Sequence, residues 1–452
     1  MFGIPTRWIC TASLTLFAAL TGVLANAQAT VNVTSYGALI NGTNSTATTA
    51  AFRTAFAAAG LAGKVVVPPG TYAIDNSAGP LTINNFQGEF KFEGNAQLVF
   101  GVGSQAGMQF NSGTGMRVIG FHSTYSSPVS SPVPGMAALA FNGTTNTFVD
   151  DVMVEKSPGP GLYFTGSVNA KVSNASILNS QSQGILFLNS LDAELVNATV
   201  TNSGQEGIVF QTNSGSTAQD GAHGANLTVT GAQGHGIAVY GESKVTISGF
   251  TVNSSTNSGI YCGTSSGSAT PANVLYQGGV IDSPAGFGIE IADATSCAFA
   301  NIQVNAAGNR GVSGSAPGGT VELRNIRVTG NTTGDGFNLS NLGTVRISDS
   351  AAEKSPGYGF FFSNVQAVVA TALTAYDVSS QNSLHRAVWF QNGASVVAFD
   401  LTLIDDQRSP TGFVVGTSAI NTGAIHSVAS AIVNGTLQIQ NRSTGVSVTS
   451  VN

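Results

Sequence analysis

Charged residues are scarce in this chain, whose 452 residues include 16 lysines and arginines against 22 aspartates and glutamates, for a net charge of −6. A chain with this charge repels polyanions, so nucleic acid and anionic membrane surfaces are not expected as partners. Cysteine is also scarce, with three in the sequence, so no disulfide framework supports the fold. No compact group of aspartates indicates a calcium site, and we expect neither a metal nor a cofactor.

A second hydrophobic run long enough to span a membrane is missing as well. The first one, Trp8–Leu24, follows Arg7 and precedes the small residues Ala25, Asn26 and Ala27. This order is typical of a secretory signal peptide with its cleavage site. We therefore predict that residues 1–27 are a signal peptide and that the mature protein begins near Gln28. It is expected to be secreted or to reside at the cell surface.

Cys10 would leave with the signal peptide, so that Cys262 and Cys297 remain. Cys262 occupies an apolar position of its segment, which favours inward-facing free thiols. A disulfide between the two is the alternative in an oxidising compartment.

What the sequence does contain is a repeat, in which a glycine and a short apolar alternation recur eleven times at intervals of 23 to 29 residues. The positions, with an alanine at one of them, are Gly161, Gly184, Gly207, Gly236, Gly259, Gly288, Gly311, Gly336, Gly359, Ala387 and Gly412. The alternation of Ile, Val and Phe in each repeat excludes a disordered chain of the same low charge. A strand-rich repeat of this length predicts an all-β parallel β-helix, in which equivalent residues of adjacent coils stack in columns.

A different segment precedes the repeats. It contains Val33-Thr-Ser-Tyr-Gly37-Ala38, a Thr-rich linker, an expected helix over residues 50–59, and Val65-Val-Val-Pro-Pro-Gly-Thr-Tyr72. These strings resemble the opening of the pectate lyase superfamily domain, the right-handed parallel β-helix group that includes polygalacturonases. The resemblance implies a capping helix, whose Phe52 and Phe56 would cover the apolar core of the first coil.

The predicted organisation is one continuous domain after the signal peptide. It consists of an N-terminal cap and first coil over residues 28–74, the single-stranded parallel β-helix over residues 75–440, and a polar C-terminal tail over residues 441–452. The 29-residue repeats are expected to form loops at residues 214–223 and 264–273, flanking one face.

The residue before each repeat glycine forms the strongest candidate column for a functional site. Its members are Gln183, Glu206, His235, Ser258, Phe287, Arg310, Asp335, Tyr358, Arg386 and Thr411. A turn position beside a parallel strand lets polar groups converge on a bound chain without being buried unpaired. The alternative is that turn residues are simply polar.

The string Gly234-His235-Gly236-Ile237 is similar to the Gly-His-Gly-Ile of polygalacturonases, but the acidic motifs of that family are altered. Asn-Thr-Asp-Gly is replaced by Gln181-Ser-Gln-Gly184, Asp-Asp by Gln205-Glu206, and Arg-Ile-Lys by Ile260-Tyr-Cys262. A glutamine can neither protonate a leaving oxygen nor activate water. Only Glu206 and His235 therefore remain as catalytic candidates in this part of the column.

Further along the column, Arg310, Tyr358 and Arg386 are candidates for lyase chemistry on a uronate, in which a cation neutralises the carboxylate and a base removes the C5 proton. Asp335 and His385 are predicted to assist in substrate binding. The alternative for Arg310 and Asp335 is a surface ion pair on neighbouring coils, worth about 0 to 1 kcal/mol.

The outward position two residues after the repeat glycine contains Tyr163, Tyr261, Glu290, Phe361 and Trp389. Exposed aromatic faces suit sugar stacking, so Tyr261, Glu290 and Trp389 complete the predicted substrate-binding set.

The resemblance implies a glycosidase or lyase that acts on a polysaccharide, of the pectin type or another acidic glycan. A noncatalytic β-helix that binds glycan or serves as a structural element of the cell surface is the alternative, which the glutamines and the low charge favour. Polysaccharide is the expected partner in either case.

Overall fold

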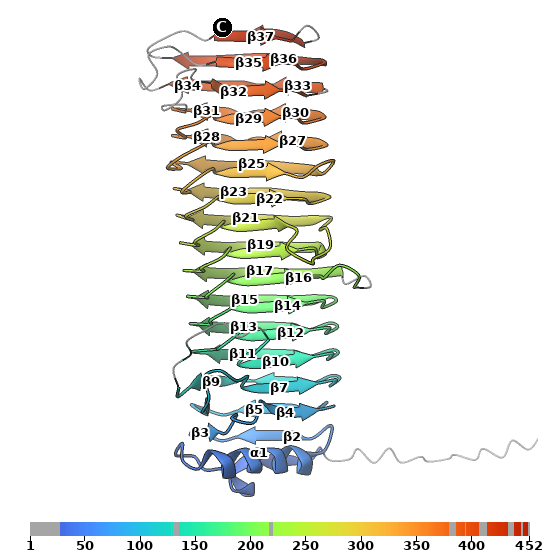
Figure 1. Cartoon of the computed structure of the whole chain (residues 1–452), viewed down its shortest axis with the longest axis vertical. Helices are drawn as coiled ribbons and strands as arrows, with labels where there is room; N and C mark the ends of the chain where they lie inside the picture. The colour runs from blue at the N-terminus through green and yellow to red at the C-terminus, as the bar shows by residue number, and fades with distance from the viewer. Residues whose placement is uncertain are drawn as a thin grey trace, which may run out of the picture.

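The chain winds into a tall stack of parallel coils, closed at one end by a helix (Figure 1). The computed structural model describes residues 28–127, 129, 135–216, 220–378, 386–393, 395–405, 414–432, 438–443 and 446–450. The predicted signal peptide lies outside the described residues. The parallel β-helix predicted from the repeat is confirmed.

Each coil contributes one short strand to a 15-stranded parallel sheet and longer or paired strands to a 23-stranded sheet. The smaller sheet consists of β4 (Leu81–Asn84), β7 (Met108–Asn111), β10 (Leu139–Asn142), β12 (Leu162–Thr165), β14 (Ile185–Leu188), β16 (Ile208–Gln211), β18 (Ile237–Tyr240), β20 (Ile260–Gly263), β22 (Ile289–Ala292), β24 (Val312–Ser315), β26 (Phe337–Ser340), β29 (Phe360–Ser363), β32 (Arg386–Gln391), β35 (Val414–Ser418) and β37 (Gln438–Arg442). The larger sheet consists of β1 (Thr30–Asn32), β2 (Lys64–Val67), β3 (Thr71–Ile74), β5 (Glu89–Phe92), β6 (Gln97–Phe100), β8 (Arg117–Ile119), β9 (His122–Tyr125), β11 (Phe148–Val154), β13 (Lys171–Leu178), β15 (Ala193–Thr201), β17 (Asp220–Thr230), β19 (Ser243–Asn253), β21 (Val274–Asp282), β23 (Ser296–Asn305), β25 (Thr320–Thr329), β27 (Thr344–Ser348), β28 (Ala351–Glu353), β30 (Ala367–Thr371), β31 (Thr374–Tyr376), β33 (Ser395–Phe399), β34 (Leu401–Asp405), β36 (Thr422–Ile432) and β38 (Val446–Ser450).

The repeat glycines stand where the chain enters the smaller sheet, immediately before strands such as β12 and β14. A Cβ at Gly161 would lie 2.2 Å from a methyl of Ile177, and one at Gly184 would lie 2.3 Å from a methyl of Val200. These distances are far below van der Waals contact. The repeat glycine is therefore required because a strand of the larger sheet packs against it across a narrow interior.

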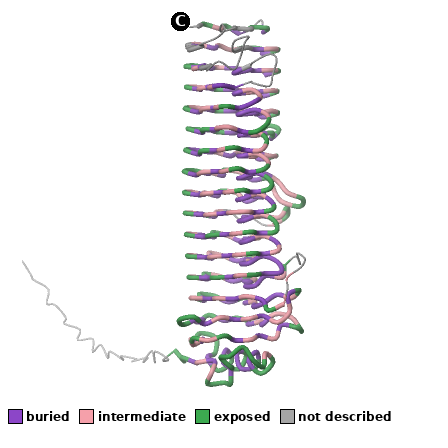
Figure 2. The backbone as a smooth tube through the Cα atoms, turned by 90° about the vertical axis from the view of Figure 1, so that its left-hand side faces the viewer, coloured by how far each residue is buried: buried purple, intermediate pink, exposed green. Residues whose placement is uncertain are grey.

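Buried and more exposed positions alternate along many strands, as the colours of Figure 2 show, whereas strands such as β18 and β20 are buried throughout. Because the coils are in register, identical residue types stack: the rings of Phe110, Phe141, Phe164, Phe187 and Phe210 are nearly parallel, with centroids 4.6 to 5.5 Å apart. This spacing is close to the distance of about 4.8 Å between neighbouring strands. The core is thus a series of ladders that run along the rod.

The long strands of the larger sheet bend at one residue with left-handed backbone conformation. In successive coils this corner is occupied by Asp151, Asn174, Asn197, Asn226, Gly249, Gly278, Asn301 and Asn325. Asparagine and glycine tolerate positive φ better than other residues, which explains much of the asparagine content of the repeats.

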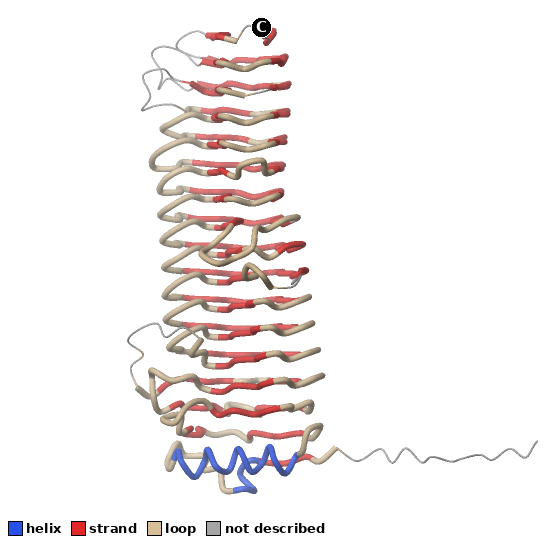
Figure 3. Tube along the Cα trace, turned by 45° about the vertical axis from the view of Figure 1, so that its right-hand side comes forward, coloured by secondary structure: helices blue, strands red, loops and turns tan. Residues whose placement is uncertain are grey.

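The helix α1 (Ser45–Ala59), preceded by the 3-10 turn η1 (Val33–Tyr36), covers the first coil (Figure 3). Phe52 packs edge-on against Tyr72 at 5.7 Å, and Phe56 lies 5.0 to 6.1 Å from three phenylalanine rings of the first coils. The capping role is therefore confirmed. The expected start at residue 50 was wrong, because the Asn44 side chain accepts the backbone N–H of Ala47 and caps the helix five residues earlier.

Cys262 and Cys297 form a disulfide, so the expectation of free thiols was wrong. Both side chains face the interior, as predicted, with exposed fractions of 0% and 3%. Cys262 lies on β20 and Cys297 on β23 of the next coil, on opposite sides of the same core, and their Cα atoms are 6.9 Å apart. An inward position in each sheet brings them together, which their sequence separation of 35 does not show.

The segment expected as a polar tail contains the end of β37 and all of β38, which pairs in parallel with β36. The described part of this segment therefore continues the coil. Among the described residues, no helix has the length and apolar content needed to cross a membrane.

Candidate functional site

The column predicted from the sequence exists and is in register from coil to coil. The backbone N–H of each repeat glycine donates to the carbonyl of the column residue in the next coil: Gly184 to Glu206, Gly207 to His235, and Gly236 to Ser258, at 3.0 to 3.1 Å. This bond fixes the height of each column residue along the rod. Around this column, two groups of charged side chains form, the first of which also takes in Glu290 from the outward position two residues after a repeat glycine.

The first group, which we name the carboxylate cluster, consists of Glu206, His235 and Glu290. Glu206 precedes β16, and its carboxylate accepts two neutral donors. The Nε2 of Gln183, one coil earlier, donates to Oε2 at 3.1 Å, and the hydroxyl of Tyr240, one coil later, donates to Oε1 at 3.0 Å. The carboxylate is thus directed along the rod toward the coil of His235.

His235 is held from the opposite side. The backbone N–H of Ser258 donates to its Nδ1 at 3.2 Å, which leaves the proton of a neutral ring on Nε2. Glu290 reaches back from the coil after that of Ser258, with its Oε2 4.0 Å from His235 Nδ1, and accepts the Ser258 hydroxyl. Glu206 therefore lies one coil before His235 and Glu290 two coils after it, and of the two carboxylates Glu290 is the one within 4.0 Å of the imidazole.

Burial lowers the pKa of His235 below its ordinary value, although Glu290 and Glu206 oppose this shift. Its side chain is 13% exposed, against 25% for that of Glu290. The lowered pKa agrees with a neutral ring whose Nδ1 accepts a backbone N–H. His235 consequently adds no positive charge to the cluster at neutral pH.

Two tyrosines complete the surroundings of His235. The Tyr261 ring lies 4.5 Å and the Tyr240 ring 6.3 Å from the imidazole, and the two tyrosine rings are 5.2 Å apart. Burial, with a smaller contribution from Glu290, raises the pKa of Tyr261 to about 12. Burial and the adjacent Glu206 likewise raise the pKa of Tyr240. Both hydroxyls stay protonated, so Tyr240 can only donate to Glu206 at ordinary pH.

Sequence reasoning placed Tyr261 at the site and missed Tyr240. Tyr240 is the last residue of β18 and faces outward. It lies two positions after the outward column position of its repeat, which was the position considered from the sequence. The sequence signal that could have identified Tyr240 is an aromatic residue at an outward position of the strand that follows His235.

The loops that lengthen two repeats contact each other over the outer face of the smaller sheet. The Ser214 N–H donates to the Gly267 carbonyl at 2.7 Å, and the Ala269 N–H donates to the Thr212 carbonyl at 2.9 Å. Beside them lies a second apolar cluster, outside the main core, which includes Leu186, Val209, Ala238, Tyr240 and Tyr261. The described parts of these loops therefore lie beside the two tyrosines; of the loop expected at residues 214–223, residues 217–219 lie outside the described residues and residues 220–223 belong to β17.

The second group, which we name the ion-pair cluster, consists of Arg310, Asp335 and Tyr358. The Arg310 Nε lies 3.7 Å from Asp335 Oδ2. Asp335 is 7% exposed and also accepts the Tyr358 backbone N–H at 2.8 Å and the Asn338 amide at 2.6 Å. The ion pair foreseen as the structural alternative is present. The Tyr358 ring stacks on Phe361 at 4.9 Å.

Three predicted site residues remain: Trp389, His385 and Arg386. Trp389 is 1% exposed, so the expectation that it presents an open face for sugar stacking was wrong. Its ring is covered, and the Arg442 guanidinium lies 5.9 Å from the ring centroid. His385 lies outside the described residues, and Arg386 is described only as the first residue of β32.

The geometry places two carboxylates along the rod on either side of a neutral imidazole with two aromatic rings beside it. The described residues contain no group of three or more His, Cys, Asp and Glu side chains suited to hold a metal ion.

Comparison with known proteins identifies a family and several solved structures with a similar architecture. A family model described as the right-handed β-helix region matches residues 75–221, 110–275 and 217–372, and no curated protein matches in sequence. Among solved structures, the chain is similar to the catalytic domain of a GH87 α-1,3-glucanase in complex with nigerose, with 16% identity and a TM-score of 0.43 over 85% of this chain. It is also similar to the A-module of the mannuronan C-5 epimerase AlgE4 of Azotobacter vinelandii, with 11% identity and a TM-score of 0.32 over 92% of this chain and 99% of that one. This chain spans 64% of the glucanase domain, less than two thirds of its length.

Proposed function

The chain belongs to the right-handed β-helix family, and from this premise we propose that its carboxylate cluster hydrolyses glycosidic bonds in a neutral polysaccharide. One observation carries the proposal: the carboxylates of Glu206 and Glu290, each held by neutral donors, lie on the two sides of the His235 coil, and Glu290 lies 4.0 Å from its imidazole. Glycoside hydrolysis requires two carboxyl groups that flank the bond to be cleaved.

In this reaction one carboxylic acid gives its proton to the leaving glycosidic oxygen as the C–O bond breaks. The other carboxylate takes a proton from the attacking water, so that one water is consumed for each bond cleaved. His235, with its proton on Nε2, is a neutral hydrogen-bond donor for a sugar oxygen. The rings of Tyr240 and Tyr261 lie beside it but are 8% and 7% exposed, so they line the imidazole and, against the expectation for Tyr261, do not offer open faces for sugar stacking.

The charge of the site favours a neutral substrate over the acidic glycan suggested by the resemblance. The carboxylate cluster has two carboxylates and a neutral histidine. The only cation in the column between Gln183 and Tyr358 is Arg310, which is paired with Asp335. A uronate carboxylate placed here would be repelled by Glu206 and Glu290 without a cation to compensate.

The test is incubation of the protein from Gln28 onward with a panel of neutral and uronate polysaccharides. New reducing ends report hydrolysis, and absorbance near 235 nm reports the unsaturated products of a lyase. We expect reducing ends from a neutral glycan, without a gain in absorbance, and none from the Glu206→Gln variant. Absorbance gained on a uronate polymer would overturn the proposal in favour of a lyase. Binding without cleavage anywhere in the panel would overturn it in favour of a noncatalytic glycan-binding rod.

A further inference from the structure

A cavity of about 580 Å³ opens at the corner of the larger sheet, away from the carboxylate cluster on the smaller sheet. It lies where the column of left-handed corner residues changes from asparagine to glycine for two coils, at Gly249 and Gly278. It is a shallow depression that is largely open to solvent.

Before the cavity, the corner asparagines form an amide ladder with a direction. The Asn197 Nδ2 donates to Asn174 Oδ1 at 3.3 Å, and the Asn226 Nδ2 donates to Asn197 Oδ1 at 3.1 Å. Beyond the cavity, Asn325 Nδ2 donates to Asn301 Oδ1 at 2.9 Å in the same direction. Each amide donates backward and accepts forward.

Interruption of the ladder leaves two different ends that face each other across the cavity. Asn226 presents its Oδ1 acceptor to the coil of Gly249, since a Cβ at Gly249 would lie 3.0 Å from this oxygen. Asn301 presents its Nδ2 donors to the coil of Gly278, because its Oδ1 already accepts from Asn325. Three coil steps separate them, about 14 Å at the usual strand spacing.

Sterics do not require glycine at these two corners. A Cβ at Gly278 would meet nothing closer than 3.9 Å, and the only close contact of one at Gly249 is the movable Asn226 side chain. The neighbouring Gly279 differs, because its Cβ would lie 2.2 Å from the Phe250 ring. Asparagine fits the same left-handed corner in the coils on both sides. The cavity is therefore a feature that two side chains would remove without strain on the fold.

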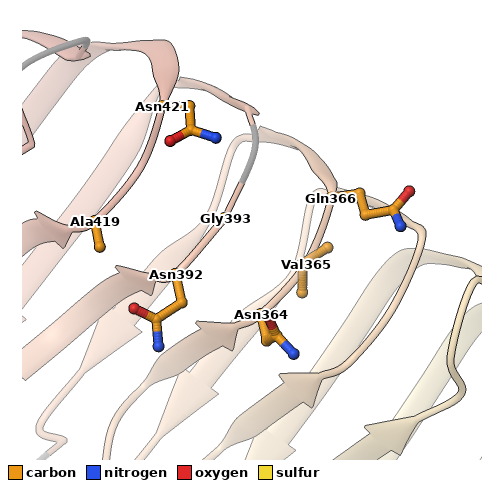
Figure 4. A pocket seen from close by; sticks show the side chains of 7 residues that line it. All are labelled: Asn364, Val365, Gln366, Asn392, Gly393, Ala419 and Asn421. Carbon is orange, nitrogen blue, oxygen red and sulfur yellow. The ribbon is translucent and has the colours of Figure 1, made fainter.

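A cavity at a corner does not by itself indicate that a pair of amides is missing from the ladder, as a second corner shows. A cavity of about 430 Å³ nearer the C-terminus is lined by Asn364, Gln366, Asn392 and Asn421, whose amide side chains line the opening in Figure 4. There Asn364 Nδ2 still donates to Asn341 Oδ1 at 2.8 Å. No pair of glycines replaces amides at that corner.

We infer that the cavity at Gly249 and Gly278 binds a neutral oligosaccharide, whose hydroxyl groups take the place of the two missing amides. A hydroxyl both donates and accepts, so one sugar segment can donate to Asn226 Oδ1 and accept from Asn301 Nδ2. Thr251 and Gln303 add further polar groups to the lining. The Arg327 guanidinium at the rim is bound to Glu353 at 2.9 Å, so it does not select an anion.

The test is binding of four neutral glucotetraoses, with α-1,3, α-1,4, β-1,3 and β-1,4 linkages, followed by saturation-transfer NMR. The variant that fills the cavity is Gly249→Asn with Gly278→Asn, and the matched control is Asn174→Gly at the same corner outside the cavity. Catalysis is silenced by Glu206→Gln in all proteins, which also separates this site from the proposed active site. We expect at least one tetraose to bind the Glu206→Gln background and the control, with at least tenfold weaker binding in the filled variant.

The thermal midpoint of the filled variant is expected to equal or exceed that of its parent, because the two asparagines extend the ladder. Residual binding at the carboxylate cluster is recognised by its loss when Tyr261→Ala is added. The inference is overturned if none of the four tetraoses binds, or if the filled variant binds as tightly as the control. An unfolded filled variant would overturn the premise that asparagine fits these corners.

Discussion

The carboxylate cluster and the ion-pair cluster lie along the same sheet, only a few coils apart, yet they handle charge in opposite ways. Glu206 and Glu290 are held by a tyrosine hydroxyl, a glutamine amide and a serine hydroxyl, which orient a carboxylate without cancelling its charge. Asp335 is bound by a guanidinium and a backbone N–H and is almost fully buried. Carboxylates held by neutral donors keep no cation beside them, whereas the Asp335 carboxylate is committed to an ion pair and to backbone and amide donors that serve the fold.

The strongest way to test this contrast is to neutralise one carboxylate in each cluster. Glu206→Gln and Glu290→Gln should each lower kcat by about 10²- to 10⁴-fold, the usual contribution of a general acid or base. Asp335→Asn should leave kcat little changed, because that carboxylate is committed to structural bonds. Initial rates of reducing-end formation measure all three. Equal losses in the two clusters would show that the distinction between them is wrong.

Removal of the disulfide should have the next largest effect, on the stability of the region around the carboxylate cluster. Cys262 follows Tyr261, so the bond anchors the strand that presents this ring. For a separation of 35 residues, loop-closure entropy gives a loss of about 3 to 4 kcal/mol. Unfolding in urea, with and without a reductant, measures the effect.

The variant Cys262→Ala with Cys297→Ala is the control for that experiment. Reductant should shift the unfolding midpoint of the natural protein and leave that of the variant unchanged. A shift of equal size in both would assign the effect to the reductant.

Asp335→Ala should destabilise the fold by about 1 to 3 kcal/mol, because it leaves the Tyr358 N–H and the Asn338 amide without their acceptor in a buried setting. Glu206→Gln should cost much less, since an amide oxygen can still accept from Tyr240. The difference in urea midpoint between these two variants is the measurement. A greater loss for Glu206→Gln would mean that the carboxylate cluster is itself structural.

The fold was largely predictable because each repeat shows its glycine and its alternation in the sequence. Close packing against residues such as Ile177 dictates the glycine, and the two-residue alternation dictates which side chains face inward. The start of α1 was missed because the helix cap depends on the Asn44 side chain rather than on apolar periodicity. The disulfide was missed because the cross-section of a coil, rather than sequence spacing, decides which inward positions meet.

The column was predictable for the same reason as the fold, because its members recur with the repeat. Its division into two clusters was not predictable from the sequence. Sequence register places Glu206 and Glu290 three coils apart, and only the side-chain direction brings Glu290 within 4.0 Å of His235. Whether an outward ring is open or covered depends on contacts from distant residues, as the position of Arg442 near Trp389 shows. Tyr240 was missed because it lies in neither of the two columns considered from the sequence, the residue before the repeat glycine and the outward position two residues after it.

The smallest expected effect concerns pH and separates the titrating histidine of the first cluster from Arg310 of the second, which stays charged. Because burial outweighs the attraction of Glu290 and Glu206, the folded pKa of His235 lies below that of the unfolded chain, near 6.5. At a pH between these two pKa values, the unfolded chain binds more protons at this histidine than the folded chain does. The stability contributed by neutral His235 is therefore complete above pH 6.5 and declines as pH falls toward the folded pKa. Urea midpoints of the natural protein and His235→Asn between pH 5 and 8 should converge on the acid side. If the natural protein instead gained stability over the variant as pH fell, the two carboxylates would dominate over burial, and His235 would be a cation in the working site.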